Sequence, residues 1–84
     1  MTELLFFGRL RDVAGYSATS RELPESVRTV AELRAWLREN DPPLGAAISA
    51  PEIRVAINQT MCVSDAESVR GAHEIAFMPP LSGG

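Results

Sequence analysis

The sequence predicts one α+β domain with a sheet of about five strands and one main helix, in the order ββαβββ. The chain has 84 residues, which suits a single domain. Several short apolar or alternating segments are bounded by glycine, proline or asparagine, a pattern typical of strands. One longer segment repeats its apolar residues at helical spacing, and the sequence contains no internal linker or repeat.

The first quarter of the chain predicts a β-hairpin. Residues 4–7 (LLFF) favour a first strand because they form a short, continuous apolar run. Residues 18–23 favour the returning strand. We expect residues 8–15 to form a connection without regular structure, closed by Gly15.

The main helix is predicted to begin at Thr29, after a loop over residues 24–28. Thr29 and Glu32 have the spacing of a capping box, in which each side chain accepts a hydrogen bond from the other residue's backbone N–H. Val30, Leu33 and Leu37 then recur at helical spacing, so one face of this helix belongs to the core.

The second half of the chain predicts the remaining strands. Residues 40–43 (NDPP) end the main helix, because proline cannot extend it and Asn40 tolerates the left-handed conformation of a helix cap. A short helical turn is expected within residues 44–50. Two strands over residues 53–57 and 60–63 then follow, joined by a turn at residues 58–59. A polar connection over residues 64–71 leads to the last strand, over residues 74–78.

The charge and hydropathy exclude several classes of function. The formal net charge is −3, and all eight basic residues are arginines, which argues against binding to nucleic acid or to an anionic membrane. The longest apolar run is residues 4–7, far too short to span a bilayer, and no signal-peptide pattern precedes it. We therefore expect a cytoplasmic protein with a protein partner.

Cysteine and histidine offer no metal site. The single cysteine, Cys62, cannot form an internal disulfide, and its apolar neighbours favour a packed structural thiol over a nucleophile. The single histidine, His73, is expected in a solvated turn. We therefore expect no metal and no tightly bound cofactor.

The C-terminus is the most informative part of the sequence. Two glycines would end a random chain only roughly once in 200, and here Gly83 and Gly84 follow Pro79, Pro80, Leu81 and Ser82. The two prolines stop the last strand and direct the chain away from the body. Residues 1–78 are therefore expected to form the domain, and residues 79–84 a flexible tail.

A tail that ends in two glycines can enter a narrow channel and deliver its terminal carboxylate to another molecule. A carboxylate becomes an acyl donor after activation, for instance as a mixed anhydride with AMP, and a sulfur or nitrogen nucleophile can then attack it. This chemistry favours a carrier protein. The chain has no lysine, so its own side chains cannot accept the activated Gly84.

Large apolar residues outside the predicted core suggest a contact surface. Several strands are apolar on both faces, and Phe7, Met61 and Met78 lie beside predicted turns or the tail. We expect these three side chains to form an exposed patch. The alternative is that they fill the ends of an ordinary core, in which case they should be fully buried.

Both ends of the chain resemble the small subunit of molybdopterin synthase. The similarity is carried by LFFGRLRDVAG at residues 5–15, VAINQT at 55–60 and EIAFMPPLSGG at 74–84. The terminal Pro-Pro-x-x-Gly-Gly after a short apolar strand is the most specific of these motifs. The order of the elements between the motifs also agrees.

This resemblance implies a ubiquitin-like β-grasp fold with a mixed sheet. It implies that an E1-like activating enzyme consumes ATP to adenylate Gly84, which is then converted to a thiocarboxylate with sulfur from a donor protein. The sulfur would pass to cyclic pyranopterin monophosphate within a heterotetramer of two small and two large subunits. The large subunit would supply the catalytic groups, and Arg11 together with the apolar patch would contact partners.

The segment before the last strand departs from the family pattern. Members of this family usually carry an acidic turn similar to Asp-Gly-Asp-Glu, whereas residues 70–74 here are RGAHE. Gly71 and Glu74 keep their places, so the turn is expected to survive with two fewer carboxylates, and the choice of activating enzyme could change. Two other functions share the fold and the terminal glycines: sulfur carriage for thiamin, cysteine or tRNA thiolation, and a ubiquitin-like modifier or interaction module.

Overall fold

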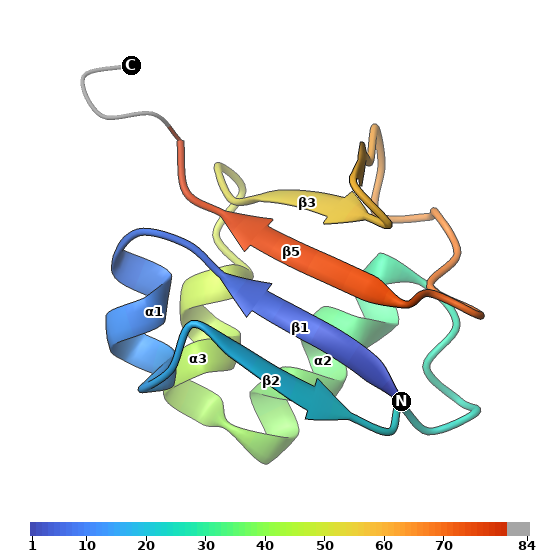
Figure 1. Cartoon of the computed structure of the whole chain (residues 1–84), viewed down its shortest axis with the longest axis horizontal. Helices are drawn as coiled ribbons and strands as arrows, with labels where there is room; N and C mark the ends of the chain where they lie inside the picture. The colour runs from blue at the N-terminus through green and yellow to red at the C-terminus, as the bar shows by residue number, and fades with distance from the viewer. Residues whose placement is uncertain (81–84) are drawn as a thin grey trace.

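The computed structural model describes residues 1–80 and contains a five-stranded mixed sheet with helices packed on it. The strands are β1 (Thr2–Phe6), β2 (Ala18–Arg21), β3 (Arg54–Ile57), β4 (Thr60–Met61) and β5 (Glu74–Met78), and the helices are α1 (Arg9–Ala14), α2 (Val30–Asn40) and α3 (Pro42–Ile48). The strand order is β2-β1-β5-β3-β4 (Figure 1). The α+β fold class predicted from the sequence is confirmed.

The centre of the sheet pairs the two ends of the chain. β1 and β5 are parallel, and the other strand pairs are antiparallel. Because β5 lies between β1 and β3, the last strand is held on both sides. The point where β5 ends, at Met78, is thereby fixed relative to the end of β1.

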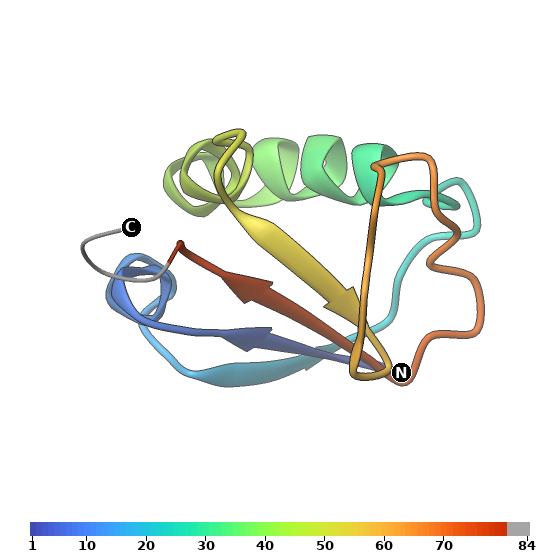
Figure 2. The same cartoon turned by 90° about the horizontal axis from the view of Figure 1, so that it is seen from above.

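The core lies between the sheet and the helices. α2 and α3 cover one face of the sheet (Figure 2). The apolar stripe of α2 is buried as predicted, and β5 contributes Ile75 and Phe77, both fully buried. Other core residues from the strands and helices are Leu4, Phe6, Leu10, Val30, Leu33, Leu37, Leu44, Ile48 and Val55.

Two predictions about helices need correction. Residues 9–14 are not an irregular connection but form α1, because Leu10 supplies a fully buried anchor and Gly15 closes the helix in the left-handed conformation, with φ 86°. The turn expected within residues 44–50 is the two-turn helix α3, which already begins at Pro42. Proline is well suited to the first helical position, so the same prolines that end α2 also begin α3.

Other boundaries differ by smaller amounts. α2 has the predicted capping box at Thr29 and Glu32, but its C-cap is Asp41, with φ −149° and ψ 82°, rather than a left-handed Asn40. The strand predicted over residues 18–23 ends at Arg21, and the one predicted over residues 60–63 is only the two-residue β4. Each of these strands ends at the last residue that pairs with the neighbouring strand.

The turn between β3 and β4 also holds the start of β5. Asn58 and Gln59 both have positive φ, 49° and 69°, as a tight hairpin of this type requires. The Asn58 Oδ1 atom accepts hydrogen bonds from the backbone N–H groups of His73 at 2.8 Å and Glu74 at 3.0 Å. The predicted turn at residues 58–59 is confirmed, and its side chain positions the last strand.

Candidate functional site

The base of the predicted tail lies against the turn between β1 and α1. Gly8 has φ 57°, and a Cβ atom at this position would lie 2.9 Å from the Pro79 Cγ atom. Glycine therefore allows the backbone to pass close to the Pro79 ring. Leu81, Ser82, Gly83 and Gly84 lie outside the described residues, so the predicted tail and the role of Gly84 stay predictions.

An apolar groove of about 880 Å³ opens beside this point. The three residues expected to form the patch all line it: Phe7 with 47% of its surface exposed, Met61 with 42%, and the half-buried Met78. None of the three is fully buried, so the alternative of an ordinary core does not apply. The groove is completed by Gly8, Arg9, Glu52, Arg54, Pro79 and Pro80.

The outward-facing side of the sheet carries an apolar row that reaches the groove at Met61. Directly paired residues point to the same side of a sheet, and one row across it runs Ala18, Leu5, Ala76, Ala56 and Met61. These side chains point away from the core, since they alternate with the core residues. Ala76 and Ala56 lie between the larger Leu5 and Met61 in this row, and Met61 is the member that lines the groove.

The charged groups at the groove come from two segments. The Arg9 guanidinium on α1 lies 3.7 Å from the Glu52 carboxylate, and both side chains are about half exposed. Arg54 on β3 is opposite Met78 on β5. Arg11, expected at a partner interface, is exposed on α1 but does not line the groove, so its partner contact stays a prediction.

Sequence reasoning missed four of the lining residues: Gly8, Arg9, Glu52 and Arg54. Arg54 and Arg9 carried no signal because an arginine in an exposed position is ordinary. The alternation of residues 53–57 does place Arg54 on the side opposite Val55. Only the strand pairing identifies Met78 as its neighbour.

The structure places Cys62 at the edge of the core rather than in the groove. The side chain is half-buried against core residues and lines a smaller pocket with Arg34 and Asp65. Burial raises the pKa of the Cys62 thiol, and the carboxylates of Glu67 and Asp65 raise it further. The thiol is therefore mostly protonated at neutral pH and a weak nucleophile.

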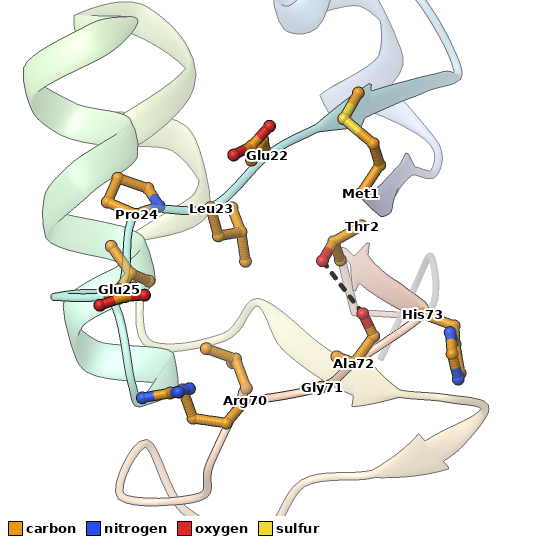
Figure 3. A pocket seen from close by; sticks show the side chains of 12 residues that line it. Met1, Thr2, Glu22, Leu23, Pro24, Glu25, Arg70, Gly71, Ala72 and His73 are labelled. Carbon is orange, nitrogen blue, oxygen red and sulfur yellow. Dashed lines mark hydrogen bonds between the residues drawn. The ribbon is translucent and has the colours of Figure 1, made fainter.

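A second pocket, of about 390 Å³, lies at the opposite end of β5. Arg70 and His73 line it from the turn before β5, and Glu22 and Glu25 line it from the segment after β2 (Figure 3). The Thr2 Oγ1 atom donates a hydrogen bond of 3.0 Å to the Ala72 carbonyl oxygen in its wall. The turn over residues 70–74 is thus separated from the groove by the length of β5.

Within residues 1–80, no group of three or more histidine, cysteine, aspartate or glutamate side chains is placed to hold a metal ion. In the same part of the chain, no helix has the length and hydropathy needed to cross a bilayer.

Known proteins share both the sequence and the fold. A family model described as the ThiS family matches residues 4–84. The chain belongs to the ThiS family. The family resemblance found at both ends of the sequence is thereby confirmed over nearly the whole chain.

Three curated relatives match this chain over nearly their whole length. Proteins of Haemophilus influenzae and Escherichia coli, each named molybdopterin synthase sulfur carrier subunit, are 32% identical over 84 residues, which is 100% of both chains in each comparison. A protein of the same name from Chlamydomonas reinhardtii is 31% identical over 83 residues, covering 98% of this chain and 96% of that one.

Solved structures confirm the β-grasp fold. SAMP1 from Haloferax volcanii has a TM-score of 0.77 and 25% identity, with 99% of this chain and 98% of that chain covered. A putative molybdopterin converting factor, subunit 1, from Pyrococcus furiosus has a TM-score of 0.72 and 21% identity, with 95% and 97% covered. At that level of identity, the second match is evidence for the fold alone.

Proposed function

We propose that this protein is the sulfur-carrier subunit of a molybdopterin synthase. The observation that carries this proposal is the full-length match to relatives of that name, together with the terminal Gly83 and Gly84. The groove supports it, because an apolar depression beside the base of the tail offers a partner a surface from which to receive the terminal carboxylate.

In this proposal an E1-like enzyme activates Gly84. The terminal carboxylate attacks the α-phosphorus of ATP, pyrophosphate leaves, and an acyl adenylate forms. A sulfide-level nucleophile, supplied by a donor protein, then attacks the carbonyl carbon and AMP leaves. The product is a thiocarboxylate.

The large synthase subunit would then receive the tail. The thiocarboxylate sulfur bonds to a carbon of cyclic pyranopterin monophosphate and displaces an oxygen substituent there. Water then cleaves the bond between this sulfur and the Gly84 acyl carbon, which regenerates the carboxylate. The small subunit has no need of an acid or base of its own for this step, since the large subunit supplies them. Two small and two large subunits would assemble into the synthase.

The test is the intact mass of the chain after incubation with ATP, the activating enzyme and a sulfide source. Replacement of oxygen by sulfur at Gly84 adds about 16 Da. The matched control is the chain without Gly84, which should gain nothing. If the full chain also gains no mass beside an enzyme shown to be active on another carrier, the proposal fails.

Two other functions use the same activated carboxylate and differ in the acceptor. A modifier would transfer Gly84 to an amine of another protein, and a carrier of another pathway would pass its sulfur to a different substrate. Transfer of sulfur from the thiocarboxylate to the pterin precursor, with the purified large subunit, separates these functions. Thiocarboxylate formation without that transfer would favour another pathway.

A further inference from the structure

Arg54 is a charged side chain within an otherwise apolar part of the groove. It lies directly opposite Met78 in the β3–β5 pairing, and the next outward-facing residue on its own strand is Ala56, which pairs with Met61. Arg54 is exposed, and both methionines line the groove with it. A partner that covers these methionines must therefore also cover the guanidinium.

The charges of the groove are not balanced within residues 1–80. Arg9 has Glu52 as an ion-pair partner at 3.7 Å. The described residues give Arg54 no carboxylate within ion-pair distance. Two arginines and one glutamate leave a local net charge of +1, although the whole chain carries −3.

Covering an unpaired cation with an apolar surface is unfavourable, because the cation loses its hydration without a compensating charge. A guanidinium is planar and presents paired N–H donors, which match the two oxygens of a carboxylate. The partner surface that fits this groove is thus apolar with one acidic group at the position of Arg54.

We propose that Arg54 determines partner specificity, by pairing with an aspartate or glutamate carboxylate on the large synthase subunit that covers the groove. This inference rests on the proposed function for the identity of the partner. A surface with an apolar or basic residue at that position would leave a covered cation unpaired, and would be rejected.

The experiment measures the dissociation constant of the full chain with the purified large subunit, for Arg54→Leu, Arg54→Lys and wild type. Removing one member of a covered charge pair should weaken binding about 30-fold or more for Arg54→Leu. Arg54→Lys keeps the charge but loses the paired donors, so its affinity should lie between the two. Arg70→Leu, an exposed arginine at the opposite end of β5, is the matched control and should bind as wild type does.

The sign of the Arg54→Leu effect distinguishes this proposal from a purely apolar contact. If the groove only needs apolar surface, leucine enlarges that surface and binding should become equal or tighter, which would overturn the proposal. Charge-neutralising substitutions of surface Asp and Glu residues on the large subunit give a second readout. At one position the substitution should weaken binding of wild type but not of Arg54→Leu, and the absence of any such coupled position would overturn the proposal.

Failure of the proposed function has a different signature. In that case wild type itself does not bind the large subunit, or binds without transferring sulfur. Binding by wild type with no loss in Arg54→Leu leaves the proposed function intact and removes only the role of Arg54. Thermal unfolding of each variant confirms that the comparison is made between folded proteins.

Discussion

Replacing Gly8 by alanine should disturb both the stability of the domain and the position of the tail. Gly8 has φ 57° and ψ −134°, a conformation that is nearly restricted to glycine. Holding an alanine there costs about 1–3 kcal/mol. The new Cβ atom would also lie 2.9 Å from the Pro79 Cγ atom, so the proline ring must move by roughly half an ångström to reach ordinary contact distance.

The expected change in melting temperature follows from the size of the domain. A loss of about 2 kcal/mol lowers the melting temperature by roughly 8–16 °C for a domain of this length. Differential scanning calorimetry gives this shift. Measured on folded protein at 20 °C, the rate of sulfur transfer from the variant's thiocarboxylate with the large subunit reports the effect on the groove and the base of the tail, separately from the loss of stability.

Gly15→Ala is the matched control, because Gly15 lies at the other end of α1 and also has a positive φ, 86°, but a Cβ atom there meets nothing within 4 Å. It should lose about 1–2 kcal/mol from strain and keep the transfer rate. A melting temperature for Gly8→Ala within about 2 °C of wild type would refute the strain reasoning. An unchanged transfer rate would refute the link between Gly8 and the tail.

Three further predictions concern other parts of the fold. Gly45→Ala should destabilise the domain by about 1–2 kcal/mol in urea unfolding, since a Cβ atom would lie 2.3 Å from the Arg38 Cα atom and overpacking outweighs the gain of about 1 kcal/mol in helix propensity. Thr29→Ala should cost about 1 kcal/mol in the same assay, because the Thr29 Oγ1 atom accepts a hydrogen bond of 3.2 Å from the Glu32 N–H. Alkylation of Cys62 by iodoacetamide should be slower in the folded than in the urea-unfolded chain at pH 8, because folding raises the pKa of the thiol. The folded state therefore holds the thiol proton more tightly. The contribution of this thiol to the free energy of unfolding is complete below the pKa of the unfolded chain and is lost as the pH rises through the pKa of the folded chain.

Each of these predictions has its own control. Ala46→Gly, at an exposed position of α3, should lose only the propensity term of about 1 kcal/mol, and a stabilised Gly45→Ala would contradict the close helix contact. Ser26→Ala, in the exposed loop before α2, should leave the unfolding free energy unchanged; an equal result for Thr29→Ala would show that the capping box contributes nothing. Cys62→Ser identifies the alkylated site, and equal folded and unfolded rates would contradict the raised pKa.

Sequence patterns correctly predicted the elements that are stabilised by residues close together in the chain. The stripe of Val30, Leu33 and Leu37 and the capping box at Thr29 both act within a few residues, and both are present. α1 was missed because a six-residue helix between two glycines has little local stability. It exists because Leu10 is buried in the core, which no neighbouring residue reveals.

The candidate site shows the same division. Phe7, Met61 and Met78 were found because three large apolar residues lay outside the predicted core. Their convergence on one groove depends on the order β1-β5-β3-β4, which brings together residues 71 positions apart in the chain. The sequence carries no signal for Arg9, Glu52 and Arg54, because only the residues that surround them in the folded structure mark them as part of the groove.

The sequence by itself determined the fold class, the start of the main helix, the family and the terminal Gly83-Gly84, because each follows from composition, residue spacing or a contiguous motif. The tertiary structure alone decided that Gly8 meets Pro79 at the base of the tail and that Arg54 stands opposite Met78. The physical reason is that strand pairing and side-chain packing join residues distant in the chain, and the energy of such contacts depends on a register that no local segment specifies.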